Sequence, residues 1–574
     1  MSIKQRINRH SLPMIFLLLL FCLRVICLDL DSPTYSLLNY TRADEGHYAM
    51  QAIKNMMIEE MQRAQALDGG QYRTWDSSAC FLCTLLCSIT LKLFGRNFYG
   101  LRLAAFLAGF ISFVLTLKLI SCEEERKKKN SHWILVMIGI CISFNFPYLI
   151  ACRFIDPGIF RIMILSITMY LVWRECSLFG EPRYFLLGIA STLSIVWGYL
   201  TNIFLFVPIA MLLLHDLINK QKIGKKVRDL ALGIIVSYFV GEICIYITQK
   251  TTFIATSLRI FQTMGDSRVS LSLNDFINNF IYLGMGNIFS YNAIFTILAI
   301  ISVVYVMISG YQKNDKFRIW LAWLIVGFLV QSIFTNDALI RKSIVIYIFL
   351  MVAIAYAAID WTDILKYFSQ LSNLKKGAIY VAFALVVMVW LEFSKRRLGL
   401  IEEMDFSSPQ KMIFIGLNIA IVCILFGGLL AIKRMPGKGL WILVTLMILP
   451  EIFMGGKYFS EAEYGDKEIM IKLNEYVGEN YVLGGYPFAY CLYNNIIPIS
   501  STYDKFFMEE RDERAKVLLE NDSVKYYLGN NDKEMIDSWL EGTLYEWELV
   551  KVFDEKARDY GGRNTIYLYE KTLK

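Results

Sequence analysis

Long apolar runs separated by short polar segments dominate the first 456 residues of the chain. The runs come in blocks of about 17 to 22 residues, and a helix needs about 20 to cross a hydrocarbon core of about 30 Å. We therefore expect about thirteen membrane-spanning helices. The apolar cores of these spans cover residues 12–28, 101–120, 132–152, 159–173, 185–199, 203–217, 230–248, 292–309, 319–334, 343–359, 378–390, 412–432 and 440–454.

Basic residues in the polar segments orient the predicted helices. The N-terminus MSIKQRINRH, ERKKKN at 125–130, NKQKIGKKVR at 219–228 and KRMPGKG at 433–439 fall on one side of the predicted membrane. Loops rich in Lys and Arg stay in the cytoplasm. No small-residue cleavage site follows the first apolar run, so we expect an uncleaved anchor with a cytoplasmic N-terminus. An odd number of spans places the C-terminus outside, although SKRR at 394–397 falls on the outer side.

Two regions depart from the span pattern. Residues 29–99 form a predicted outer loop with two surface helices: a mixed-polarity segment that begins at Asp44, and a short apolar run at 78–94 that would lie in the interface. Residues 457–574 are charged, rich in tyrosine and without a spanning run. YVLGGY, SVKYYLG and NTIYLYE predict strands, and ERDERAKVLLEN and DKEMIDSWLEG predict amphipathic helices. We therefore divide the chain into a membrane domain, 1–456, and a small extracytoplasmic α/β domain, 457–574.

Composition agrees with a polytopic membrane protein. The chain has 574 residues, of which 56% are hydrophobic, and its mean hydropathy is +0.45. A polar exterior would dilute the apolar content of a soluble protein of this length. The net charge of +7 comes from short clusters between apolar runs, so it orients helices and does not indicate nucleic-acid binding. Cys80, Cys83 and Cys87 have no second pair and no nearby histidine, which favours packing over a zinc site.

Charged residues stand out where the predicted outer loops meet the membrane, because charge there is costly and usually has a function. Asp44 and Glu45 open the first surface helix. Carboxylates at that position suit the helix dipole, and they equally suit a general base or a metal ligand. Asp156 precedes Pro157 at the start of a span, which fits an N-cap as well as a catalytic role.

The other candidates are mostly cations that suit a phosphate. Arg341 and Lys342 share a very short outer turn, where they would either reach the headgroups or hold a phosphate. Arg259 and Arg268 lie in a long outer loop. Asp76, between the two surface helices, is either a metal ligand or a solvated loop residue. No Walker loop, GxSxG elbow or dinucleotide fingerprint is present in the sequence.

Together, these features resemble the GT-C superfamily of membrane glycosyltransferases. The likeness is to the branch that holds the protein O-mannosyltransferases and the bacterial aminoarabinose transferase that modifies lipid A. In these enzymes an acidic DE…YA motif opens the outer loop, an LFG…F..R stretch follows, a DP comes after the third span, and a basic pair precedes a late span. The matching residues are Asp44-Glu45-Gly46-His47-Tyr48-Ala49, Leu93-Phe94-Gly95 with Phe98 and Arg102, Asp156-Pro157, and Arg341-Lys342.

The resemblance implies an activity and roles for these residues. Members use a polyprenyl-phosphate sugar as donor, so the leaving lipid phosphate needs cations and the acceptor hydroxyl needs a base. Asp44 would be that base or would position the acceptor. Asp156 and Glu45 would support Asp44 or bind a divalent cation, and Asp76 would join Glu45 in that metal site. The other implied substrate or phosphate ligands are Arg341, Lys342, Arg259, Arg268 and Tyr48. A single displacement predicts inversion at the sugar carbon, whereas TWDSS at 74–78 departs from the Lys-Pro or Pro-Pro of relatives.

Two other function classes remain open at this stage. A secondary transporter or a flippase of lipid-linked sugars would carry polar residues near mid-membrane and show paired halves. Here the spans are almost free of acids and the charges gather on one face. A degenerate relative that acts as a scaffold is the third reading. We expect a multi-pass plasma-membrane hexosyl- or pentosyltransferase whose partners are membrane lipids, the lipid-linked donor and a lipid, glycan or protein acceptor.

Overall fold

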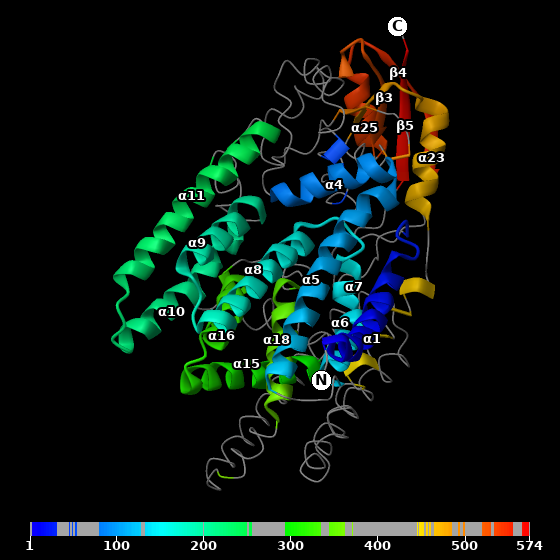
Figure 1. Cartoon of the computed structure of the whole chain (residues 1–574). Helices are drawn as coiled ribbons and strands as arrows, with labels where there is room; N and C mark the ends of the chain where they lie inside the picture. The colour runs from blue at the N-terminus through cyan, green and yellow to red at the C-terminus, as the bar shows by residue number, and fades with distance from the viewer. Residues whose placement is uncertain are drawn as a thin grey trace.

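The computed structural model of the chain is mainly helical, with one small sheet gathered at one end of the helical bundle (Figure 1). The predicted spans 378–390 and 412–432 lie outside the residues that the structure describes. The described residues are 3–30, 45, 49, 52–53, 80–127, 133–198, 200–249, 252–254, 293–334, 344–361, 370, 445, 447–449, 451–452, 455–456, 458–460, 464–484, 492–493, 497–499, 519–529, 533–554 and 565–572.

The described helices follow the predicted apolar runs closely. In chain order they are α1 (Ile3–Cys22), η1 (Leu23–Val25), α4 (Phe81–Phe94), α5 (Phe98–Arg126), α6 (Trp133–Phe144), α7 (Phe146–Ala151), α8 (Pro157–Phe179), α9 (Tyr184–Leu193), η3 (Ser194–Gly198), η4 (Leu200–Leu205), α10 (Phe206–Ile218), α11 (Gly224–Gln249), α15 (Ala293–Lys313), α16 (Lys316–Phe334), η6 (Ile344–Ile346) and α18 (Tyr347–Ile359). Within the described part of the chain, α5, α8 and α11 are long and apolar enough to cross a membrane, and several shorter apolar helices accompany them. The number of about thirteen spans stays a prediction.

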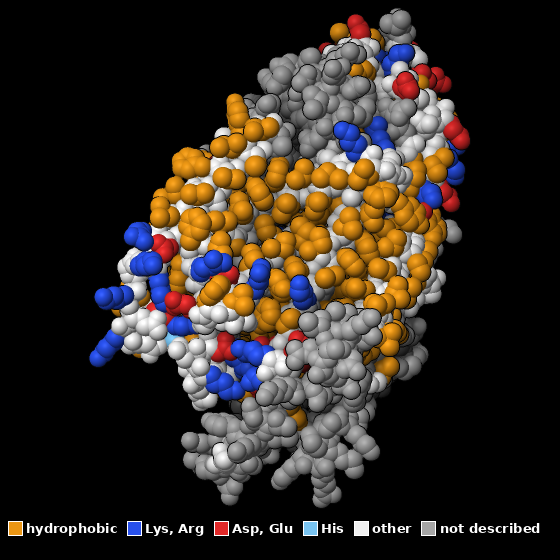
Figure 2. All heavy atoms as spheres, viewed as in Figure 1, with side chains coloured by type: hydrophobic (Ala, Val, Ile, Leu, Met, Phe, Trp, Pro, Cys, Tyr) orange, Lys and Arg blue, Asp and Glu red, His pale blue; other side chains and the backbone are white. Residues whose placement is uncertain are grey.

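Two helices show how the bundle is built. Every residue of α18 is buried, as its uniformly apolar sequence YIFLMVAIAYAAI requires. Helix α11 instead lies at the edge of the bundle and leaves large apolar side chains exposed, including Phe239 and Ile247. Figure 2 shows a broad band of hydrophobic side chains on this face, with charged side chains gathered toward its two ends. Such a band suits the hydrocarbon core of a bilayer.

Two glycines let α9 and α11 approach each other closely. A Cβ atom on Gly233 would lie 2.2 Å from the carbonyl oxygen of Phe185, and one on Gly188 would lie 2.6 Å from that of Leu230. Small residues at helix contacts are typical of membrane proteins, because backbone proximity supplies van der Waals contact where the hydrophobic effect does not distinguish side chains from lipid.

The structure corrects the prediction of a single span at 132–152, because this stretch forms two helices, α6 and α7. Pro147 lies in the first turn of α7, where a missing N–H costs nothing, and the Asn145 side chain accepts a hydrogen bond from the backbone N–H of Tyr148 at 2.9 Å. Both features start a new helix and break the old one.

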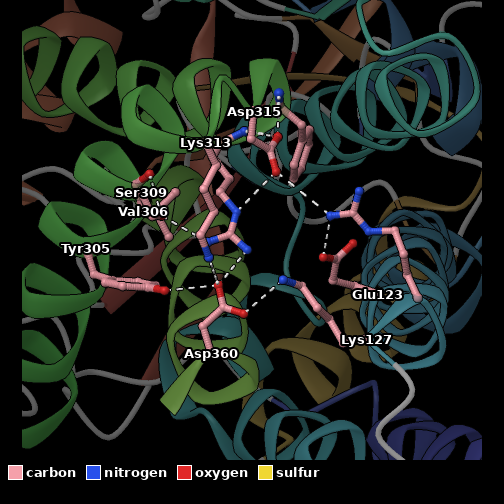
Figure 3. A network of polar contacts seen from close by, with 11 residues as sticks. Glu123, Lys127, Tyr305, Val306, Ser309, Lys313, Asp315 and Asp360 are labelled. Carbon is pink, nitrogen blue, oxygen red and sulfur yellow. Dashed lines mark hydrogen bonds and ion pairs between the residues drawn. The ribbon is translucent and has the colours of Figure 1, made fainter. Parts of the chain in front are cut away.

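A buried ion network closes the end of the bundle at which α5 and α18 finish. Asp360, the residue that follows the end of α18, pairs with Arg318 at 2.7 Å and with Lys127 at 3.4 Å. It also accepts hydrogen bonds from Tyr305 at 3.0 Å and Lys313 at 3.5 Å (Figure 3). Asp360 and Arg318 are 2% and 1% exposed, so their charges need each other. We call this end of the bundle the network end.

The sheet near the C-terminus has five strands in the order β2-β1-β3-β5-β4. Strand β1 is parallel to β2 and β3, and β5 is antiparallel to β3 and β4. The predicted strands correspond to β1, β3 and β5, while β2 and β4 were not predicted. We call the described residues from 464 to 572 the C-terminal unit. Its elements are α23 (Gly465–Val477), β1 (Tyr481–Gly484), β2 (Ile497–Ile499), β3 (Val524–Gly529), α25 (Lys533–Glu541), β4 (Glu546–Asp554) and β5 (Thr565–Thr572).

The parallel strands direct their carboxyl ends toward the bundle. Lys467, in the first turn of α23, binds the bundle residue Asp29. The chain runs away along α23, turns at Gly478 with φ of 59°, and returns along β1. Tyr493, nine residues after the end of β1, again contacts the bundle at Arg96. Since β2 and β3 are parallel to β1, all three strands end near the same face of the bundle.

Candidate functional site

Asp156 marks the end of the bundle opposite the network end, where α8 begins. Its backbone is extended, and its Oδ1 accepts a hydrogen bond from the N–H of Gly158 at 2.7 Å, with Pro157 in the first turn. The predicted N-cap geometry is therefore present. Asp156 is half-buried, so the carboxylate is held at a fixed place at the helix start. We call this end of the bundle the site end.

Glu45 lies directly beside this helix start. Its carboxylate accepts two hydrogen bonds from the Arg102 guanidinium, at 2.8 and 2.7 Å, in a bidentate ion pair. The same carboxylate accepts a longer contact from the N–H of Ile155, at 3.4 Å. Glu45 and Arg102 are 7% and 1% exposed. The structure therefore joins three stretches that are far apart in sequence: the acidic motif, the arginine of α5 and the loop before Asp156.

Local sequence explains where Arg102 points. Asn97 caps α5 by accepting from the N–H of Gly100 at 2.8 Å, which fixes the helix start. Arg102 then lies one turn after Phe98, on the same side of the helix. Its guanidinium stacks over the rings of Phe98 and Phe154, at 4.2 and 4.4 Å from their centroids. Aromatic faces stabilise a desolvated cation, so Arg102 tolerates burial in this orientation.

Three buried arginines hold the chain segment that leaves α1. We call residues 23–30 the exit strap. Arg102 donates to the carbonyl oxygens of Leu28, at 2.7 Å, and Leu30. Arg153 donates to the carbonyl oxygens of Arg24, Ile26 and Cys27.

Arg24, inside the exit strap, extends the same pattern toward α6 and α7. It donates to the carbonyl oxygens of Ile142 at 2.6 Å, Ser143 at 2.8 Å and Tyr148 at 3.3 Å. Its guanidinium also lies over the Phe21 ring, 4.3 Å from the centroid. Carbonyl and aromatic partners stabilise these guanidiniums without cancelling their charge. The site end therefore carries a concentration of fixed positive charge next to Glu45 and Asp156.

One contact between the C-terminal unit and the exit strap is an ion pair. Lys467 Nζ lies 2.8 Å from Asp29 Oδ2, and Asp29 is 5% exposed. Burial raises the pKa of Asp29, but the hydrogen bond and charge of Lys467 outweigh it and hold that pKa below its ordinary value. The same hydrogen bond raises the pKa of Lys467. Both groups are therefore charged near neutral pH.

The sequence-predicted site residues divide into two groups. Glu45 and Asp156 are described, and the structure brings them to the same place. The other predicted site residues lie outside the described residues, so the roles given to them stay predictions. These residues are Asp44, Tyr48, Asp76, Arg259, Arg268, Arg341 and Lys342.

The described part of the chain contains no set of ligands for the predicted divalent cation. No group of three or more histidine, cysteine or carboxylate side chains there is arranged so that it could hold a metal ion. Both oxygens of Glu45 accept from Arg102, which leaves this carboxylate engaged in an ion pair. No step proposed below depends on a metal ion.

Sequence reasoning missed the roles of Arg24 and Arg153. The signal was present, because Arg24 interrupts the apolar run FCLRVICL and Arg153 follows the apolar stretch of α7. An ionisable residue within or against a membrane segment indicates a specific partner. Here the partners are backbone carbonyls, which a sequence pattern does not reveal.

No protein-family model matches the chain, and no curated protein matches its sequence. Its fold does match solved structures. The apo structure of ArnT from Cupriavidus metallidurans matches with 13% sequence identity and a TM-score of 0.54, over 97% of each chain. The structure of ArnT from that organism bound to undecaprenyl phosphate matches with 11% identity and a TM-score of 0.53, over 98% of each chain. The Archaeoglobus fulgidus oligosaccharyltransferase, crystallised with Zn and sulfate, matches with 12% identity and a TM-score of 0.45, over 97% of this chain and 75% of its own.

The two ArnT matches span nearly the whole of both chains. The resemblance to GT-C glycosyltransferases that the motifs indicated is therefore confirmed for the fold. A fold at this level of identity does not carry a reaction with it. The reaction has to be argued from the residues at the site end.

Proposed function

We propose that this chain is a membrane glycosyltransferase that moves a sugar from a polyprenyl-phosphate donor to an acceptor hydroxyl at the site end. One observation carries the proposal: the Arg102–Glu45 pair holds the acidic motif against the backbone of Ile155, next to Asp156. Two sequence motifs that the fold family uses for its chemistry thus meet at one place. The ArnT structure that contains undecaprenyl phosphate supports a lipid-linked donor of this kind.

In the proposed mechanism, Asp44 takes the proton of the acceptor hydroxyl or positions that hydroxyl for attack. The hydroxyl oxygen bonds to the anomeric carbon while the bond to the lipid phosphate breaks, so the phosphate leaves with the electron pair. Asp156, fixed at the start of α8, supports the acceptor or the developing positive charge on the sugar. A single displacement inverts the anomeric configuration.

The leaving phosphate needs cations, and Arg341 and Lys342 are the proposed ones, with Arg259, Arg268 and Tyr48 as further ligands. Arg24 of the exit strap and Arg153, which binds the strap, support this proposal from a distance. Arg24 and Arg153 add fixed positive charge at the site end without themselves contacting the substrate. An anionic donor headgroup would be attracted to this end of the bundle.

Asp44→Asn, assayed for transfer from a panel of polyprenyl-phosphate sugars, tests the proposed base. We expect the rate to fall at least about a hundredfold, because general base catalysis contributes about 10²–10⁴. Glu475→Gln, an exposed carboxylate on α23, is the matched control and should leave the rate unchanged. Undiminished transfer by Asp44→Asn would remove Asp44 from the chemistry. Movement of lipid-linked sugar across liposomes without any transfer would favour the flippase alternative.

A further inference from the structure

Two contacts lead from the C-terminal unit to Arg102. The first is the ion pair between Lys467 and Asp29, 2.8 Å apart. Asp29 lies in the exit strap between Leu28 and Leu30, the two residues whose carbonyl oxygens accept from Arg102. Moving Asp29 would therefore move both of these acceptors.

The second contact is Tyr493, in the segment between β1 and β2. Its backbone N–H donates to the carbonyl oxygen of Arg96 at 3.0 Å, and its hydroxyl accepts from the N–H of Phe98 at 3.3 Å. The Tyr493 and Phe98 rings lie edge to face, with centroids 5.9 Å apart. The Phe98 ring that Tyr493 contacts also carries the guanidinium of Arg102, which stacks on it. Both contacts thus converge on the residue that binds Glu45.

The backbone at both contacts is in an unfavourable conformation. Tyr493 has φ of 63°, and Cys27, two residues before Asp29, has φ of 54°. This left-handed region is uncommon for residues other than glycine. Such conformations persist only where surrounding contacts fix them, and they gather at functional sites.

The direction of the sheet agrees with an active role. The carboxyl ends of β1, β2 and β3 face the bundle, and the segment that carries Tyr493 emerges from that edge. In open α/β sheets the carboxyl edge is the edge that carries functional loops. The unit therefore presents its functional edge to the site end.

We propose that Lys467 and Tyr493 are positioning residues of the site. They hold Arg102 from two sides, and through Arg102 they hold Glu45 against Ile155 and beside Asp156. The C-terminal unit is then a working part of the site, since its contact with the bundle sets the geometry of the acidic motif. This inference rests on the proposed function only in the experiments that measure sugar transfer.

Lys467→Met and Tyr493→Phe, measured in the full chain, test the proposal through kinetics. We expect kcat to fall about three- to tenfold in each, with KM for the donor changed less than twofold, because the groups act on the acid motif and not on the donor. Lys472→Met is the matched control: it lies on the same helix, is exposed, and should leave kcat unchanged. The exchange Asp29→Lys with Lys467→Asp rebuilds the ion pair in reverse and should restore most of the loss.

Hydrogen exchange gives a readout that does not need activity. In Lys467→Met and Tyr493→Phe, the amides of 28–30 and 98–102 should exchange faster than in Lys472→Met. Wild-type chain that shows no transfer with any donor would refute the proposed function, while the exchange data would still test the contact. Unchanged exchange would overturn the positioning role. Faster exchange with unchanged kcat would overturn it as well, because the contact would then be structural only.

Discussion

At the residue scale, the site end is built around arginines that bind backbone carbonyls. Arg24, Arg102 and Arg153 are each at most 3% exposed. Arg102 and Arg153 donate to carbonyl oxygens of the exit strap, and Arg24 donates to those of α6 and α7. Arginine suits this role because its planar group carries five donors and remains charged when buried. The geometry of Glu45 and Asp156 depends on these contacts.

Asp156→Asn separates a catalytic role from a capping role. Asparagine caps a helix about as well as aspartate, so the variant should keep the hydrogen bond to Gly158 and the thermal stability of the wild type. We expect its transfer rate to fall about a hundredfold or more, because the negative charge is lost. Asp156→Ala, which loses both cap and charge, should also lower stability by about 1 kcal/mol. A fully active Asp156→Asn would show that the carboxylate is only a cap.

Arg102→Lys tests the bidentate pair. Lysine keeps the charge but offers a single point of contact, so it does not reproduce the two parallel hydrogen bonds to Glu45 or the stacking on Phe98 and Phe154. We expect a stability loss of about 2–4 kcal/mol and a lower transfer rate, read by thermal unfolding in detergent and by the transfer assay. Lys118→Arg, an exchange at an exposed cation of the same helix, serves as the control. Wild-type behaviour of Arg102→Lys would show that charge alone is sufficient there.

Of the site residues predicted from the sequence, Glu45 and Asp156 lie in the described part of the chain. Asp156 and Glu45 stood out because carboxylates at a membrane boundary are costly, and the structure places them side by side. The partner of Glu45 was harder to predict, since 57 residues separate it from Arg102. The carbonyl partners of Arg24 and Arg153 could not be predicted, because every residue has a carbonyl group and only the fold selects among them.

At the element scale, helix contacts depend on glycine at α11 and on ion pairs at the network end. The pattern of long apolar runs predicted the helices, since a continuous apolar segment in a membrane has few structures other than a helix that satisfy its backbone hydrogen bonds. It did not predict the break between α6 and α7, which Asn145 and Pro147 produce together. It also missed β4, although EWELVKVFD alternates between polar and apolar side chains over part of its length.

Gly233→Ala should weaken the contact of α11 with α9. The added Cβ would lie 2.2 Å from the carbonyl oxygen of Phe185, and backbone on both sides cannot yield without separating the helices. We expect a loss of about 1–3 kcal/mol, measured as a lower unfolding temperature. Gly224→Ala, which meets nothing within 4 Å, is the control and should be neutral. Equal stability of the two variants would contradict the close packing.

Asp360→Asn should destabilise the network end. The substitution preserves shape but leaves Arg318, Lys127 and Lys313 without their shared carboxylate. Removing one partner from a buried ion pair costs about 3–5 kcal/mol, so thermal unfolding should occur at a clearly lower temperature. Asp229→Asn, at an exposed ion pair with Arg228, should change stability by less than about 1 kcal/mol. Similar effects of the two substitutions would count against the buried network.

At the scale of the whole molecule, the chain combines an apolar helical bundle with a small α/β unit at the site end (Figure 1). The motifs predicted the GT-C fold because their order along the chain is specific even where each motif is weak. The number and orientation of the spans rest on hydropathy and on basic loops, and they stay predictions. How the C-terminal unit joins the bundle could not be predicted, since Lys467 and Asp29 are 438 residues apart.

The central claim is that this end of the bundle transfers a sugar from a polyprenyl phosphate. To test this transfer, the reconstituted protein is incubated with a panel of polyprenyl-phosphate sugars and candidate acceptors. Released polyprenyl phosphate is then quantified by mass spectrometry, and the anomeric configuration of the product is determined by NMR. We expect one polyprenyl phosphate to be released per glycoside formed, with inverted configuration. A product with retained configuration would contradict the single displacement, and labelled donor that crosses the bilayer without releasing polyprenyl phosphate would contradict transfer itself.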